Sequence, residues 1–425
     1  MQPCTCNICL SKKDVDKPNN KKIQAAFSRL MEWLHATREF KIRDIKSPIV
    51  RSMISETAAV FNGAVDVELK NVPPDDVLVR SLKQSGYVFS SFKTLAQIKE
   101  AQNLLVDNKG DIKPFEQYLN DVQAINKEYN ERYLFSEYKF AVASAQMADK
   151  WVRFVKDGDR YDLQYRTAND NRVRDTHAEL HNVTLPVDSP FWDKYFPPNG
   201  WGCRCTVVQV RQGKHPRANL REAMKRGDDA TSGTYAKMFR FNPGKLGTLF
   251  PPHNPYTPSR CSGCSKSGFP LAKIPDNELC AACPLIREMA KNEEEVRIRR
   301  KEIFKEARKS IQGTTIKHKD LHKDISISRN SIKEFLNQPH KYRKEKNELL
   351  LDIRKVISES DYRGVSEPYM KKQDFDSHIF EVIVGGEKSW IIVREYNDGE
   401  VLLHSISDNE NVTKGIKKAT KQAPL

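Results

Sequence analysis

The chain has 425 residues, a formal net charge of +15 at pH 7 and a hydrophobic fraction of 38%. One hydrophobic core rarely organises a chain of this length, so two or three domains are expected. No stretch approaches the roughly 20 apolar residues of a membrane-spanning helix, and the first residues lack the apolar segment of a secretory signal, so we expect neither. The positive charge favours contact with nucleic acid or another polyanion, although a basic protein without such a partner has the same composition.

The patterns along the chain predict an α+β protein of several domains. A helical N-terminal region comes first, an α+β domain follows, and a small α+β domain with an antiparallel sheet ends the chain. Three apolar, β-branched runs separated by glycine turns mark that sheet: HIFEVIV, KSWIIV and EVLLHSI. The expected boundaries are 1–20 for a cysteine-containing tail, 21–120 for the helical region, 121–215 for the first α+β domain, 216–258 for a linker, 259–285 for a zinc-binding segment, 286–313 for a charged helical spacer and 314–425 for the C-terminal domain.

The cysteines predict a metal site and a reducing compartment, because they fall into tight groups in a chain without a visible signal. Cys261, Cys264, Cys280 and Cys283 have the spacing of a four-thiolate zinc site. Four protein ligands leave no position for a substrate water, so zinc there would be structural. The alternative is unliganded or redox-active pairs. The N-terminal Cys4, Cys6 and Cys9 do not complete a tetrahedral site and are expected in a disordered tail.

An ordered set of motifs lies between Asn130 and Arg211. In chain order they are Arg166-Thr167, Arg174 with His177, Phe191-Trp192, Pro198-Asn199-Gly200 and Cys203-Arg204-Cys205. The set resembles the head-morphogenesis, or minor capsid, domain of tailed phages, the family named after the phage Mu F protein. His181-Asn182 departs from the family pattern, which puts the local turn geometry in doubt but not the domain.

The two cysteines at the end of this set admit two interpretations. His177 and His181 are spaced i, i+4 on one helix face, so both could join Cys203 and Cys205 in a metal site. The alternative, which we favour from the sequence, is a packed thiol pair beside a hydrogen-bonded histidine that closes the fold. In that interpretation Arg166, Arg174, His177, Trp192, Cys203 and Cys205 form a structural motif.

The resemblance implies a role in virion assembly. Its expected partners are the portal and capsid proteins of a phage or prophage, with contact to packaged DNA, and its expected location is the virion or the host cytoplasm. The positive charge fits DNA contact, because each neutralised phosphate releases counterions.

A second, looser resemblance concerns the C-terminal domain. Helices followed by an antiparallel sheet are similar to the phage-associated nucleases of the barnase, EndoU, colicin and RelE type. This resemblance implies a toxin-like domain that cleaves RNA without a metal or another catalytic cofactor, with an RNA substrate and an immunity protein as partners.

Cleavage of this kind needs a base, an acid and cations that stabilise the transition state. His378 and His404 are the candidate acid and base, because imidazole exchanges protons near neutral pH. Arg394 completes the candidate catalytic set, and Arg329 and Lys333 are candidates to hold phosphate. One alternative is a C-terminal domain that only binds protein or nucleic acid. Another is a DNA-binding zinc-ribbon protein unrelated to phages.

Overall fold

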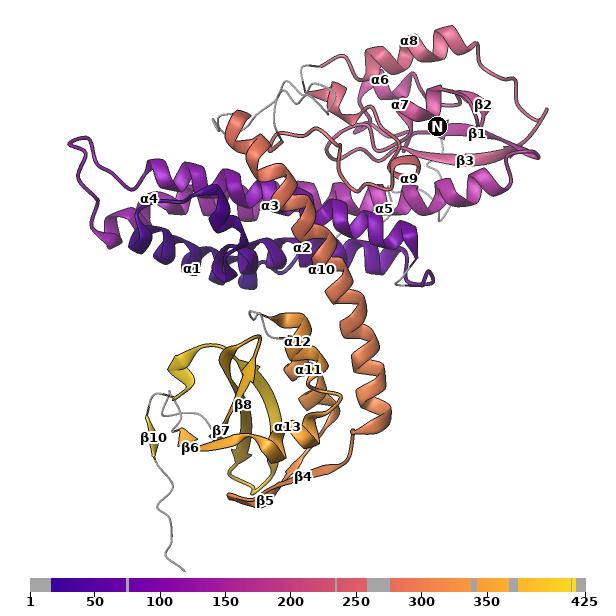
Figure 1. Cartoon of the computed structure of the whole chain (residues 1–425). Helices are drawn as coiled ribbons and strands as arrows, with labels where there is room; N and C mark the ends of the chain where they lie inside the picture. Colours follow the sequence, from indigo (N-terminus) through magenta and orange to yellow (C-terminus); the bar gives the residue numbers. More distant parts are fainter. Residues whose placement is uncertain are drawn as a thin grey trace, which may run out of the picture. The chain divides into compact units, whose positions relative to one another are not determined.

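A computed structural model describes residues 17–73, 76–233, 235–257, 276–337, 342–366, 374–413 and 415–417. The chain divides into two compact units, unit 1 (Met1–Lys291) and unit 2 (Asn292–Leu425) (Figure 1). Both contain helices, and each has its own antiparallel-rich sheet, so the predicted α+β class is confirmed. None of the helices within these ranges is long and apolar enough to cross a membrane.

Unit 1 begins with a helical bundle, in agreement with the pattern over 21–120. Ser47 caps the second helix through the backbone NH of Val50, and Pro48 occupies the first helical position, where its missing NH costs nothing. Apolar faces of these helices pack into one core that includes Phe27, Phe61 and Phe89. The helices are α1 (Lys21–Thr37), α2 (Pro48–Glu68), α3 (Val77–Asn103), α4 (Phe115–Lys127) and α5 (Leu134–Lys156), with a 3-10 turn at Ile42–Lys46 and a π-helical segment at Glu128–Tyr133.

Helix α5 leads directly into the first α+β domain. Its C-terminal half packs with the sheet in a second core around Trp192, Tyr165 and Val207. The sheet has the order β2-β1-β3, and both pairings are antiparallel. Its elements are β1 (Tyr161–Arg166), α6 (Asp175–Ala178), β2 (Thr184–Pro186), α7 (Phe191–Tyr195) and β3 (Thr206–Arg211).

Residues 216–258 were expected to be a linker, and the structure corrects this expectation. The segment contains α8 (Leu220–Ala230), a 3-10 turn (Ala236–Phe239) and α9 (Pro243–Leu246). Phe250 stacks on Phe89 of α3 at 3.7 Å between ring centroids, and Tyr256 is buried. The segment therefore forms part of the bundle core. Its buried aromatic residues are not spaced at helical intervals in the sequence.

Unit 2 contains a seven-stranded sheet with the order β10-β6-β7-β8-β9-β5-β4. The three predicted strands are β7, β8 and β9, and only the β5–β9 pairing is parallel. Helices cover one face, where Phe335 and Ile303 pack with Phe380 of the sheet. The strands are β4 (Thr315–His318), β5 (Leu321–Ser326), β6 (Asp361–Ser366), β7 (Phe375–Val384), β8 (Glu387–Tyr396), β9 (Val401–Ser407) and β10 (Ile416–Lys417). The helices are α11 (Arg329–Asn337), α12 (Arg343–Glu348) and α13 (Ile353–Glu359), with a 3-10 turn at Glu410–Thr413. Helix α10 (Asp276–Ser310) begins in unit 1, and its residues from Asn292 onward belong to unit 2.

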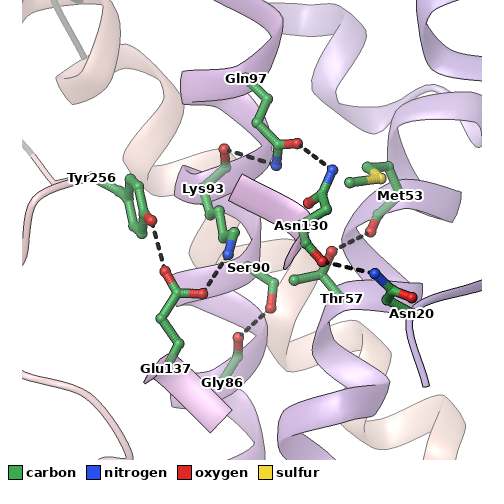
Figure 2. Close-up of polar contacts among 10 residues, drawn as sticks. All are labelled: Asn20, Met53, Thr57, Gly86, Ser90, Lys93, Gln97, Asn130, Glu137 and Tyr256. Carbon is green, nitrogen blue, oxygen red and sulfur yellow. Dashed lines mark hydrogen bonds and ion pairs between the residues drawn. The ribbon is translucent and has the colours of Figure 1, made fainter. Parts of the chain in front are cut away.

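The bundle encloses an ion pair between α3 and α5 (Figure 2). Lys93 donates to Glu137, and the two side chains are 0% and 4% exposed. The Tyr256 hydroxyl donates to the other carboxylate oxygen of Glu137 at 2.6 Å. Burial lowers the pKa of Lys93, and the neighbouring Glu137 opposes that shift. The burial of each of these three polar side chains therefore depends on its contacts with the others.

Removing one charge of this pair should destabilise unit 1 strongly. Lys93→Met leaves the Glu137 carboxylate buried without its cation, which costs about 3–5 kcal/mol, whereas Lys93→Met with Glu137→Met should recover most of the loss. Urea unfolding followed by tryptophan fluorescence measures this, because four of the five tryptophans lie in unit 1. Lys127→Met, on the exposed side of α4, is the matched control and should change little. Equal effects of Lys93→Met and Lys127→Met would contradict the assignment.

Candidate functional site

Two thiols and an imidazole meet inside the first α+β domain. The Nδ1 atom of His177 lies 3.9 Å from the Cys203 Sγ and 3.7 Å from the Cys205 Sγ. The three residues are buried, with exposures of 3%, 8% and 2%. Their donor atoms all lie within 4.8 Å of one another. We call these three residues the thiol-imidazole cluster.

The Cys-Arg-Cys sequence produces this arrangement by alternation along extended backbone. Successive side chains point in opposite directions, so both thiols face His177 and Arg204 faces away. Arg204 instead forms a bidentate ion pair with Asp170. Its hydrogen bonds lower the pKa of Asp170 to about 2. Strand β3 begins only at Thr206, so the cysteines lie just before the strand.

The two thiols of the cluster have pKa values that are shifted in opposite directions. Hydrogen bonds from the Cys205 thiol and from His177 lower the pKa of Cys203. The hydrogen bond to Cys203 and burial raise the pKa of Cys205. One thiol of the pair is thus prepared to lose its proton, and the thiolate is the form that binds a metal ion.

The cluster has the geometry of part of a tetrahedral metal site. With zinc–sulfur bonds of about 2.3 Å and zinc–nitrogen bonds of about 2.0–2.1 Å, neighbouring sulfur and nitrogen ligands lie about 3.6 Å apart. The observed separations of 3.7 and 3.9 Å are close to that value. His177, Cys203 and Cys205 therefore have sulfur–nitrogen separations that suit three of the four ligands of a tetrahedral metal ion.

His181 does not belong to the cluster, which corrects the two-histidine form of the metal site. Its Nδ1 atom accepts a hydrogen bond from the Thr167 backbone NH at 3.2 Å and lies 2.9 Å from the Thr167 hydroxyl. Burial and the nearby Arg166 lower the pKa of His181. The residue therefore fixes the end of β1 rather than supplying a ligand.

The remaining motif residues support the same domain. Trp192 is fully buried and donates from its indole nitrogen to the Pro186 carbonyl at 2.9 Å. Arg174 donates to the Trp201 carbonyl at 2.8 Å and lies against Gly200, where an added Cβ would be 3.3 Å from its guanidinium. Arg174, which directly precedes α6, thus holds the proline-glycine turn in place.

The predicted four-cysteine zinc site lies partly outside the described residues, as do Cys4, Cys6 and Cys9. Cys261 and Cys264 fall there, whereas Cys280 and Cys283 lie one turn apart in α10. Residues three apart on a helix are neighbours on its surface, so this pair could contribute two thiolates to one ion. The helix also merges the predicted zinc segment with the predicted spacer.

In unit 2, His378 belongs to a relay of polar groups on the helix-covered face of the sheet. The Tyr362 hydroxyl lies 2.8 Å from its Nδ1, and Glu395 lies 2.9 Å from its Nε2. Because a carboxylate only accepts hydrogen bonds, Nε2 donates and Nδ1 accepts from the tyrosine. Lys323 lowers the pKa of Glu395, which keeps it charged.

His404 and Arg394 lie elsewhere. Arg394 pairs with Ser377 in the strand register and His378 pairs with Val393, so the arginine and His378 point to opposite faces. Arg394 packs over the Phe375 ring at 3.9 Å. His404 is the extra residue of a bulge in β9, and burial, with the nearby Arg394, lowers its pKa to about 4. The three candidate catalytic residues are therefore not gathered in one cleft.

The predicted phosphate-binding residues begin α11. Arg329 is exposed at its first position, and Lys333, one turn later, lines a pocket that Arg329 does not reach. The sequence suggested both as cations near the start of a helix, where they could hold phosphate.

Comparison with known proteins matches two segments of the chain. Residues 97–208 match the family described as phage Mu protein F like protein. Residues 294–404 match the family described as large polyvalent protein-associated domain 3, a description that names no activity. No solved structure gives a significant match.

Two curated relatives support the first match. The chain is 38% identical over 77 residues to the putative capsid assembly protein F of Escherichia phage Mu, an alignment that covers 18% of each protein. It is 46% identical over 49 residues to the Mu-like prophage FluMu F protein of Haemophilus influenzae, with 12% of each covered. The alignments thus span less than a fifth of either relative. The resemblance predicted from the motifs is confirmed for residues 97–208, the segment that contains the thiol-imidazole cluster.

Proposed function

We propose that this chain is a head-assembly protein of a tailed phage or prophage that acts at the portal vertex. The observation that carries the proposal is the match of residues 97–208 to the phage Mu protein F like family, one relative of which is named a putative capsid assembly protein. The partners would be the portal and capsid proteins, and the protein would be part of the virion after synthesis in the host cytoplasm. The net charge of +15 supports contact with packaged DNA.

The packing of unit 1 supports a rigid assembly module. Motif residues that are far apart in the sequence share one core, in which Trp192 and Phe191 are fully buried. The cluster pairs two thiols with an imidazole, but all three side chains are buried, so a substrate has no open approach to them. A buried, hydrogen-bonded cluster of this kind stabilises a surface rather than turning over a substrate.

Purified particles of the encoding phage or prophage should contain this chain and should cross-link it to the portal protein. Deletion of residues 97–208 should abolish particle formation, because it removes the assembly module. Deletion of 292–425, all of unit 2, is the control and should leave particles intact. Mass spectrometry of particles and plaque yield measure both. Normal particles without the chain would contradict the proposal and would favour a DNA-binding zinc-ribbon protein.

We also propose that the thiol-imidazole cluster holds a structural Zn²⁺ ion. Two sulfur donors and one nitrogen donor are a set that zinc prefers, and the burial of all three argues against exchange of substrate at the ion. The four-cysteine set Cys261, Cys264, Cys280 and Cys283 remains our proposal for a second structural zinc site.

Zinc content of the whole chain tests both sites. Cys203→Ser with Cys205→Ser should remove one zinc per chain, and Cys261→Ser with Cys264→Ser should remove another, because serine is a poor zinc ligand. Cys4→Ser with Cys6→Ser is the matched control and should leave the zinc content unchanged. Elemental analysis after gel filtration gives the stoichiometry. An unchanged content in the first pair would indicate a packed thiol pair without metal.

For unit 2 we propose a binding module instead of an RNA-cleaving toxin. A two-histidine mechanism needs an acid and a base in one cleft. Arg394, whose charge acts on His404, points to the opposite face of the sheet from His378. His378 is also held between Tyr362 and Glu395. The separation of these groups supports binding without cleavage, and an immunity protein would then be unnecessary.

The whole chain should leave a labelled RNA intact, with and without divalent metal, between about pH 5 and pH 8, where histidine titrates. Denaturing gels measure the RNA length. Cleavage that both His378→Ala and His404→Ala abolish, with Lys355→Ala as the unaffected control, would restore the nuclease interpretation and overturn the binding module.

A further inference from the structure

Helices α10 and α11 of unit 2 enclose a pocket of about 350 Å³. Its residues come from positions of α10 that recur every three or four residues, and from the second half of α11. The lining consists of Arg300, Lys301, Phe304, Lys305, Arg308, Lys333, Leu336 and Asn337. We call it the basic pocket.

The basic pocket brings five cationic side chains together in its lining: Arg300, Lys301, Lys305, Arg308 and Lys333. None of the described residues that line it is acidic, although α10 is rich in glutamate. Glu302 and Glu306 instead contact Arg299, each at 3.2 Å, and Arg299 lies outside the lining. The acidic side of α10 is therefore neutralised, whereas Lys305 and Lys333 form no ion pair within the described part of the chain.

The partial burial of Arg300 makes its positive charge energetically unfavourable. Arg300 is half-buried, and burial together with Arg343 lowers its pKa. Glu293 opposes that shift but is already paired with Arg343. A partly desolvated guanidinium among other cations gains most from a bound anion, because arginine matches phosphate with two parallel hydrogen bonds.

The basic pocket also has the length and the apolar surface that a nucleic-acid strand uses. Arg300 and Arg308 are separated by eight helical positions, so the row of cations extends about 12 Å along α10, enough to meet more than one phosphate. Phe304 packs partly against the core of unit 2 and also lines the pocket, with the Arg308 guanidinium 5.9 Å from its ring centroid. An aromatic ring beside a cationic groove can stack a base. Asn337 adds an amide that can pair with a base edge.

We propose that the basic pocket binds the phosphate backbone of single-stranded nucleic acid. This inference rests on the binding role proposed for unit 2 and names its site and its ligand. The combination of cations with an aromatic ring favours a nucleic-acid strand over an acidic peptide, because an acidic peptide would use the cations but not Phe304.

Binding of the whole chain to a fluorescent oligothymidylate, measured by anisotropy over a range of salt concentrations, tests the proposal. Lys305→Gln with Lys333→Gln should weaken binding and should reduce the slope of log affinity against log salt by about 1.4, since each contact to a single strand contributes about 0.7. Lys317→Gln with Lys355→Gln removes the same charge from exposed positions outside the pocket and should leave the slope unchanged. Lys305→Arg with Lys333→Arg should retain it.

Three outcomes would overturn the proposal: no binding by the unaltered chain, equal loss in the two glutamine pairs, or equal competition by polyglutamate. The last would indicate an acidic protein as the partner. Circular dichroism confirms that each variant is folded. Cleavage of the oligonucleotide, followed on a gel, would contradict the binding role of unit 2 without affecting the assignment of the pocket.

Discussion

The thiol-imidazole cluster is the constraint on which the α+β domain of unit 1 depends. It joins α6 to the residues that precede β3, across a loop of more than twenty residues that contains β2 and α7. Phe191 and Trp192 of that loop are buried in the same core as Cys203 and Cys205. Whether the ends are joined by a metal ion or by hydrogen bonds decides how much stability the cluster contributes, because a structural zinc supplies folding free energy directly.

Helix α5 connects this cluster to the rest of unit 1. Its first half carries Glu137, the partner of the buried Lys93, and its second half packs against the sheet. Lys150 of α5 donates to the Thr206 hydroxyl at 2.6 Å, at the start of β3 and next to Cys205. This continuity agrees with the family match, which begins in α3 and ends in β3. The segment that resembles the phage Mu protein F like family is thus longer than the motifs that indicated the resemblance.

Much of this architecture was readable from local signals, and the rest depended on contacts between distant residues. Apolar spacing predicted the helical region, and glycine turns with β-branched runs predicted strands β7 to β9. The segment 216–258 has no hydrophobic period, so only its packing against Phe89 reveals that it is core. Spacing gave His177 and His181 equal standing as ligands, and the hydrogen bonds from Thr167 separate them. Likewise, the opposite directions of His378 and Arg394 follow from a strand register that composition does not contain.

The two units differ in how their charged side chains are paired. Unit 1 buries the Lys93–Glu137 ion pair in its core, whereas Lys305 and Lys333 of unit 2 form no ion pair within the described residues. Zinc binding by the thiol-imidazole cluster of unit 1 is tested most directly by X-ray absorption at the zinc edge, in a chain with Cys261, Cys264, Cys280 and Cys283 changed to serine. Zinc should be retained, with sulfur neighbours at about 2.3 Å and nitrogen at about 2.0–2.1 Å. Zinc that is absent, or bound without sulfur, would contradict it.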